Sequence, residues 1–90
     1  MLRGLKQIFG IYKTGYEYWV LTDSIKVPPD YELTEIGQVK WDRKVDYYFR
    51  TGKFESPILL DRRFHMIDGY SSVTLARVTG LEKVPVYFVD

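Results

Sequence analysis

The hydrophobic residues near the N-terminus recur every three or four positions, which is the spacing of one face of a helix. They are Leu2, Leu5, Ile8, Phe9 and Tyr12, and basic or amide side chains fall between them. This spacing predicts a short amphipathic helical extension in residues 1–14, which Thr14-Gly15 ends. A helix that covers part of the sheet is favoured over one that lies on a membrane surface, because the stretch is short.

The next segments have the composition of strands rather than helices. Residues 16–21 are rich in aromatic and β-branched side chains and predict a strand, and residues 25–27 predict a second short extended piece. Pro28-Pro29 should exclude a helix at that point. Residues 30–39 show neither period, so we expect a surface loop there.

Residues 42–51 give the clearest helical pattern in the chain. Apolar side chains fall at i, i+4, i+7 and i+8, which predicts one buried aromatic stripe made of Trp41, Val45, Tyr48 and Phe49. Asp42 suits the start of a helix, because its charge complements the helix dipole. Gly52 stands where a C-terminal cap is expected.

The C-terminal third predicts two strands, a helix and a last strand. Residues 58–60 and 64–67 are apolar and flank Asp61-Arg62-Arg63, which predicts a hairpin. A helical pattern over residues 71–79 stops at Gly80, and Leu81 can supply the hydrophobic contact of the cap. Residues 84–89 form the last strand. Pro85 must lie at its start or on an edge, because proline cannot donate a hydrogen bond to a ladder.

Composition places these elements in one small domain. The chain has 90 residues, of which 46% are hydrophobic, so it can bury one modest core and we expect a single domain over residues 1–90. Together with the predicted order of helices and strands, this length indicates a small α+β fold with its core at about residues 17–89. We expect a cytoplasmic protein with no membrane partner, because no apolar run is long enough to span a bilayer or to form a signal-peptide core.

Charge and residue types exclude several kinds of chemistry. There is no cysteine, which excludes disulfides, thiolate metal sites and thiol catalysis, and the single histidine, His65, disfavours a zinc site. The formal charge is +1, so there is no overall field that would hold nucleic acid nonspecifically. His65 lies in a predicted strand, where a packed or edge-exposed imidazole is favoured over a general base.

One stretch has the pattern of a functional junction. The predicted strand at Phe64–Ile67 runs into Asp68-Gly69-Tyr70-Ser71-Ser72 and then into a helix. Glycine permits a sharp turn and a close approach, and the free N–H groups of the helix start favour an anion such as phosphate. Local chemistry alone favours the alternative, which is a tight turn followed by a hydroxyl N-cap.

The last third also resembles a known family, the ParB N-terminal domain of the ParB/sulfiredoxin superfamily. The resemblance rests on the order and spacing of short motifs, namely Pro57-Ile58-Leu59-Leu60, Phe64 to Tyr70, the helix from Ser72 to Leu81, and Val84-Pro85-Val86. It extends upstream through Ile25 to Pro28 and Lys44 to Lys53, and so covers about residues 17–89. The resemblance implies a compact mixed sheet with about three helices.

The same resemblance implies a pocket where a Gly-x-x-Arg helix start meets the sheet. ParB proteins bind and hydrolyse CTP there, some relatives are ADP-dependent kinases, and sulfiredoxins use ATP. In this chain the motif is Gly69-Tyr70-Ser71-Ser72, so Ser72 occupies the place of the phosphate-binding arginine and Tyr70 that of the sulfiredoxin cysteine. The sulfiredoxin reaction is therefore excluded. Loss of the arginine removes a charge-assisted phosphate partner worth about 1.5–3 kcal/mol.

Three hypotheses of function follow. The first is a stand-alone ParB-like binding or regulatory module without robust catalysis. Its degenerate pocket would consist of Asp68, Gly69, Tyr70, Ser71 and Ser72, and the candidate ligand is a nucleotide with magnesium. The second is a nucleotide-dependent phosphotransferase or nucleotidase in which Asp68 is a base or a magnesium ligand. No set of residues in the sequence predicts a metal site built by the protein alone.

The third hypothesis is a small nucleic-acid or protein-interaction factor of a mobile element. Its surface would consist of Arg43, Lys44, Arg50, Lys53, Arg62 and Arg63, with Trp41, Tyr47 and Phe54 interleaved. A solvated helix face is the favoured interpretation of these charges, because their excess over nearby acids is mild.

Overall fold

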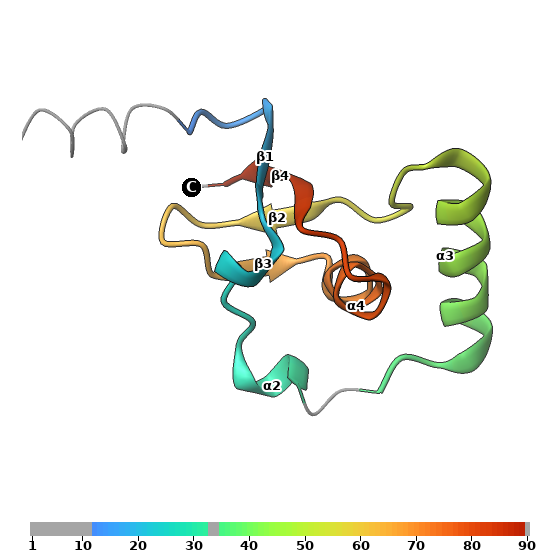
Figure 1. The fold of residues 1–90 in the computed structure, drawn as a ribbon. Coiled ribbons are helices and arrows are strands. Elements are labelled where there is room, and N and C mark those ends of the chain that lie inside the picture. The colour runs from blue at the N-terminus through green and yellow to red at the C-terminus, as the bar shows by residue number, and fades with distance from the viewer. Residues whose placement is uncertain (1–11, 33–34, 90) are drawn as a thin grey trace, which may run out of the picture.

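The computed structural model describes residues 12–32 and 35–89, which form a mixed four-stranded sheet with helices beside it (Figure 1). The strands are β1 (Glu17–Leu21), β2 (Ile58–Leu60), β3 (Met66–Asp68) and β4 (Lys83–Phe88). The helices are the short 3-10 turn η1 (Thr22–Ser24), α2 (Pro29–Glu32), α3 (Gln38–Thr51) and α4 (Tyr70–Thr79). The α+β prediction is confirmed.

The sheet has the order β1-β4-β2-β3, with β4 inside it. β4 pairs antiparallel with β1 and parallel with β2, and β2 pairs antiparallel with β3 in the predicted hairpin. Parallel neighbours need a crossover, and the segment through β3 and α4 supplies it. Residues 25–27 are extended as predicted, and Lys26 forms a single bridge with His65.

The core lies on one face of this sheet, against α4. Burial alternates along β4, so that Val84, Val86 and Phe88 are fully buried while the residues between them face outward. Val73 and Ala76 of α4 are equally buried and belong to the same hydrophobic cluster. The predicted end of α4 is confirmed, because Gly80 is left-handed and the N–H of Leu81 donates to the carbonyl of Ala76 at 2.9 Å.

The predicted loop over residues 30–39 is wrong at both ends. α2 begins at Pro29, so the prediction that Pro28-Pro29 excludes a helix is also wrong. Proline is tolerated there because the N–H groups of the first helical turn have no intrahelical acceptor. α3 begins at Gln38, four residues before the predicted start. Its end is correct, with Gly52 left-handed at φ 74°.

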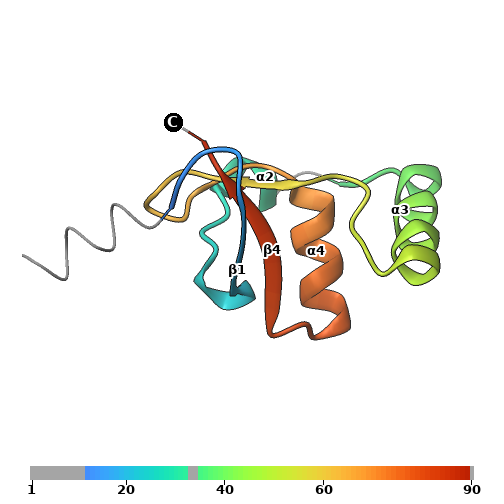
Figure 2. The same ribbon diagram turned by 90° about the horizontal axis from the view of Figure 1, so that it is seen from above.

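The aromatic stripe of α3 is not buried as predicted. Phe49 is 69% exposed, and Trp41, Val45 and Tyr48 are only half-buried. The buried side chain of this helix is that of Lys44. Figures 1 and 2 give the reason, because the sheet, α4 and α3 stand in a row and α3 is outermost.

Pro85 is the third residue of β4, in the interior of the sheet, and not its first. It lies opposite Trp19 of β1, whereas pairing with β2 begins one residue later, at Ile58 and Val86. On the β2 side Pro85 therefore precedes the ladder, so its missing N–H leaves no acceptor of that ladder unsatisfied.

Most of the predicted N-terminal helix, residues 1–11, lies outside the described residues. Tyr12 to Thr14, which the prediction included, are not helical. Tyr12 instead stacks on Phe88 with ring centroids 4.3 Å apart and meets Tyr18 and Phe64 edge-on. Within residues 12–32 and 35–89, no helix combines the length and apolar character needed to cross a bilayer.

The turn between β2 and β3 is organised by Asp61. Its Oδ1 accepts the backbone N–H groups of Arg63 and His65, each at 2.9 Å, and its Oδ2 lies 3.0 Å from Nδ1 of His65. Partial burial raises the pKa of the Asp61 carboxyl, but the hydrogen bonds from His65 and Arg63 and the His65 charge lower it by more, so the net pKa is below the ordinary value of an aspartate. Phe64 completes the turn with φ 68°.

We therefore expect acid to weaken the fold partly through Asp61. Its folded pKa is lowered, so its contribution is present above about pH 4 and is lost as the pH falls through the folded pKa. The side chain is 37% exposed, so the loss should be at most about 1 kcal/mol. Urea denaturation at about pH 5 and about pH 3 would show a smaller acid loss for Asp61→Asn than for the wild type. Equal losses would contradict this prediction.

Candidate functional site

The predicted strand-to-helix junction at Gly69 is confirmed, and it is unusually tight. Gly69 is the N-cap of α4 and has φ 96°. A Cβ at this position would lie 2.6 Å from the carbonyl oxygen of Pro57 and 2.7 Å from Cα of Ile58. The start of α4 therefore touches the backbone at the start of β2, and only glycine permits this approach.

The two serines do not cap the helix in the way that local chemistry favoured. Among the described residues no side chain caps α4. The hydroxyl of Ser72 is buried and donates to the carbonyl oxygen of Ser56 at 2.6 Å, which ties α4 to the segment before β2. The N–H groups of the first helical turn have no intrahelical acceptor, so the start of α4 retains its capacity to bind an anion.

A cavity of about 210 Å³ lies at this helix start. Four of the five predicted pocket residues line it, namely Asp68, Gly69, Tyr70 and Ser71, whereas Ser72 does not. The opposite side comes from α3 and the segments around it, with Tyr31, Glu35, Ile36, Gly37, Lys40, Lys44 and Ser56. The structure thus brings α3 and α4 together around one polar cavity.

Lys44 is the cation most firmly held at this cavity. Only 5% of it is exposed, and its Nζ donates to Ser56 Oγ at 2.5 Å and to Glu55 Oε1 at 3.3 Å. Arg43 contacts the same Glu55 oxygen at 3.1 Å. Desolvation raises the pKa of the Glu55 carboxyl, but the hydrogen bonds and charges of Lys44 and Arg43 lower it further, so its net pKa is below the ordinary value.

Sequence analysis placed Lys44 on an outer basic surface, and that placement is wrong because the side chain is buried at the cavity. Lys40 was not predicted to belong to any site, yet it lines the same cavity. A signal existed in the sequence, because residues four apart share one helix face. The spacing of Lys40 and Lys44 could have indicated that one side of α3 presents two ammonium groups.

Asp68 and Tyr70 line the cavity on either side of Gly69. Asp68 is exposed, and its Oδ1 accepts the N–H of Gly69 at 2.8 Å. The ring of Tyr70 lies 5.5 Å from that of Tyr31, whose hydroxyl donates to the carbonyl of Ile67 at 3.4 Å. In the described part of the chain, no group of three acidic or histidine side chains is arranged to hold a metal ion.

The six basic residues of the predicted interaction surface do not form one patch. Arg62 and Arg63 lie in the β2–β3 turn, at the opposite end of the molecule from α3 (Figures 1 and 2). Arg62 donates to the carbonyl of Tyr12 at 3.0 Å. Arg50, on α3, lies 3.5 Å from Asp46 and over the ring of Tyr47.

His65 is exposed at the edge of the sheet, bridged to Lys26 and close to Asp61. It does not line the cavity at the start of α4. This arrangement corresponds to the edge-exposed imidazole that sequence analysis favoured over a general base.

Comparison with known proteins assigns the fold. No protein-family model and no curated protein matches the sequence. Solved structures do match, among them a pNOB8-like ParB N-domain, with a TM-score of 0.69 and 17% identity over 83% of this chain and 30% of that one. The C-terminally truncated chromosome-partitioning protein ParB from Caulobacter crescentus, complexed with CTP-γ-S, matches with a TM-score of 0.64 and 16% identity over 84% of this chain and 45% of that one.

A third similar structure is a free serine kinase variant in complex with AMP, with a TM-score of 0.65 and 17% identity over 88% of this chain and 33% of that one. At these identities the similarity establishes the fold, and the chain spans less than half the length of each of these proteins. The described residues therefore have the fold that these structures share. In particular they have the architecture of a ParB N-domain, as the sequence motifs predicted.

Proposed function

We propose that the cavity at the start of α4 binds a phosphate-bearing ligand, a nucleotide with magnesium, and that the domain works as a binding or regulatory module without robust catalysis. One observation carries this proposal. The start of the ten-residue helix α4, which has no side-chain cap, and two lysines of α3, Lys40 and Lys44, line the same cavity. Backbone N–H groups on one side and ammonium groups on the other are the donors that phosphate oxygens accept from.

The charges around the cavity support weak rather than tight binding of a phosphate. Lys44 is already paired with Glu55, and the acids Glu35 and Asp68 line the same cavity as the two lysines. Magnesium is commonly held by one or two carboxylates together with ligand phosphates, and Asp68 is exposed in a suitable place. The bound cation would then reduce the repulsion between Asp68 and the phosphate.

The side chain at position 72 supports the non-catalytic part of the proposal. Ser72 is engaged with the carbonyl of Ser56 and is absent from the cavity lining. Lys44 supplies a point charge, whereas an arginine would supply a planar fork that fits two phosphate oxygens at once. Fewer directed donors mean poorer positioning of a transferable phosphoryl group.

The similar structures agree with a nucleotide as ligand. One is a ParB protein complexed with CTP-γ-S and another is a free serine kinase complexed with AMP. These ligands belong to those proteins, and they define the set of nucleotides that should be tried first on this chain.

Calorimetric titration with CTP, ATP and ADP in the presence of magnesium tests the proposal. We expect saturable binding of at least one nucleotide with a Kd of about 10 µM to 1 mM, and no phosphate release. The parent nucleoside, which lacks the phosphates, is the matched control and should not bind. Absence of any binding would overturn the proposed ligand class, and turnover of a tightly bound nucleotide would overturn the non-catalytic role.

A phosphotransferase or nucleotidase is the second candidate, and the position of Asp68 is the observation that favours it. Its carboxylate is exposed at the cavity and next to the helix start, where it could hold magnesium or accept a proton. If turnover is found, Asp68→Ala and Ser71→Ala should each reduce it at least about tenfold. Unchanged turnover in both variants would exclude this mechanism.

A further inference from the structure

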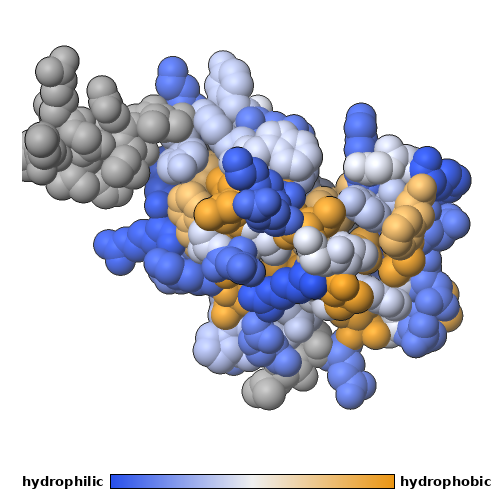
Figure 3. Space-filling view, in the orientation of Figure 1, coloured by the Kyte–Doolittle hydropathy of each residue, from blue (hydrophilic) through white to orange (hydrophobic). Residues whose placement is uncertain are grey.

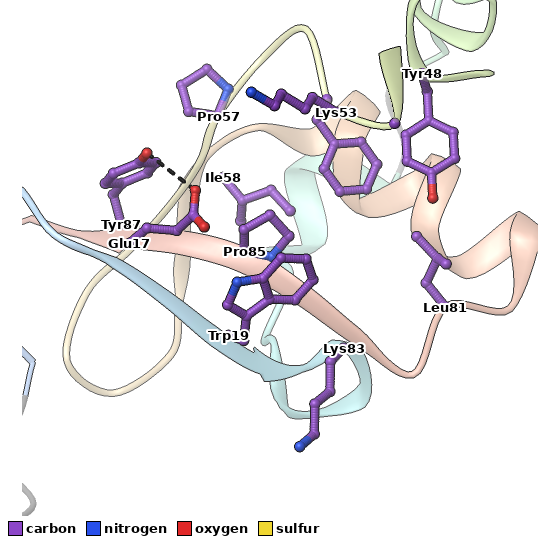
Figure 4. Close-up of a pocket in the computed structure, with 12 residues that line it drawn as sticks. Glu17, Trp19, Tyr48, Lys53, Pro57, Ile58, Leu81, Lys83, Pro85 and Tyr87 are labelled. Atoms are coloured by element: carbon purple, nitrogen blue, oxygen red, sulfur yellow. Dashed lines mark hydrogen bonds between the residues drawn. The ribbon is translucent and has the colours of Figure 1, made fainter. Parts of the chain in front are cut away.

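A second concave site lies on the other side of the segment that joins α3 to β2, and it shares no lining residue with the cavity at Gly69. It is a groove of about 470 Å³ between the outward face of β1 and β4 and the C-terminal end of α3 (Figure 4). Volumes of this order hold small organic ligands. Apolar side chains are visible on the surface between α3 and the strands (Figure 3).

Aromatic side chains from β1 and from the α3 side line this groove. Trp19 of β1 is 63% exposed and stacks on no other ring among the described residues. Tyr48 and Phe54 stack on each other on the α3 side, with centroids 5.1 Å apart. Ile58, Leu81 and Pro85 supply apolar side chains around them. The exposed indole is therefore accessible to a ring that enters the groove.

The charged groups at the rim define the sign of the ligand. Lys53 and Lys83 extend from opposite ends of the groove (Figure 4), and neither has an ion-pair partner within the described residues. The one acid that lines the groove, Glu17, accepts a hydrogen bond from Tyr87 at 3.4 Å. The charged groups that line the groove are thus two lysines against one glutamate, a net charge of 2 − 1 = +1, which favours an anion.

From these observations we propose that the groove binds a small planar aromatic anion, with its ring beside Trp19 and its charge toward Lys53 or Lys83. The apolar side chains of the groove would exclude water from the ligand ring, and the long, flexible lysine side chains can move their ammonium groups toward its negative group. This site is independent of the nucleotide cavity, so each proposal can fail without the other.

The experiment uses naphthoate as the anionic probe and naphthalenemethanol as its neutral counterpart, followed by two-dimensional amide NMR spectra of the whole chain. The chain has two tryptophans, so the indole N–H of Trp41, outside the groove, is an internal control for that of Trp19. We expect saturable shifts of the Trp19 signal, and affinity for naphthoate about 3- to 10-fold above that for the alcohol.

Variants separate the contribution of the Trp19 ring to probe binding from that of the two lysine charges. Trp19→Ala should abolish saturable binding, while Lys53→Met with Lys83→Met should remove the preference for the anion and leave binding of the alcohol unchanged. Phe49→Ala is the matched control, because Phe49 is exposed but does not line the groove. Equal shifts of both indoles, equal affinity for both probes in the wild type, or tighter and steeply salt-dependent binding of oligo-dT would overturn the proposal.

Discussion

Gly69→Ala should unfold or nearly unfold the domain, with a loss of about 3–5 kcal/mol in the free energy of unfolding. Two costs coincide at this position. The backbone is held at φ 96°, which L side chains rarely adopt, and the new methyl would lie 2.6 Å and 2.7 Å from backbone atoms of Pro57 and Ile58. Ile58 is fully buried in β2, so the strand cannot move away without disturbing the core.

Urea denaturation would measure this loss against a matched control. Gly80→Ala meets the same backbone restriction, at φ 72°, but a Cβ there has nothing within 4 Å. It should cost only about 1–2 kcal/mol, the price of a left-handed alanine. A domain of this size has a total stability of about 5–13 kcal/mol, so the two variants should differ plainly. Similar losses in both would show that the close approach at Gly69 is not what the junction requires.

The turn at Gly69 could be predicted from the sequence, but the close contact that it makes could not. Asp68-Gly69 after an apolar run predicted the turn, because glycine and a change of period are local signals. Gly69 contacts the backbone of Pro57, which is twelve residues earlier in the sequence, and no local sequence pattern predicts a contact over that separation. The fold could be predicted because the order and spacing of short motifs resemble those of ParB N-domains. The similar solved structures confirm this fold.

The errors concern α3 and its surroundings. Helical periodicity identified the helix and its end at Gly52, but periodicity predicts which residues share a face and not whether another element covers that face. Because α3 stands outside α4, its aromatic side chains remain partly exposed, and one of them, Tyr48, lines the groove beside β1 and β4. Lys44 is buried because Glu55 and Ser56, far along the chain, supply its partners.

Lys44→Met should weaken nucleotide binding about 10- to 100-fold, if the proposed ligand class is correct. A hydrogen bond to a charged group contributes about 1.5–3 kcal/mol, and Lys44 is the cation that the structure holds at the cavity by two side-chain contacts. Methionine keeps most of the apolar stem, so the cavity should not collapse. Calorimetric titration with the nucleotide that binds the wild type best would give the ratio of Kd values.

The matched control is Arg43→Met, because Arg43 contacts the same Glu55 oxygen but its side chain is 63% exposed and does not line the cavity. Loss of Arg43 disturbs the ion pair without removing a cavity cation, so its effect on Kd should stay within about threefold. Urea denaturation of both variants shows whether the fold persists, since Glu55 keeps one cationic partner in each. Equal effects of the two variants on Kd would mean that Lys44 acts by fixing the α3–β2 segment. A selective effect of Lys44→Met would instead place its ammonium group on the bound phosphate.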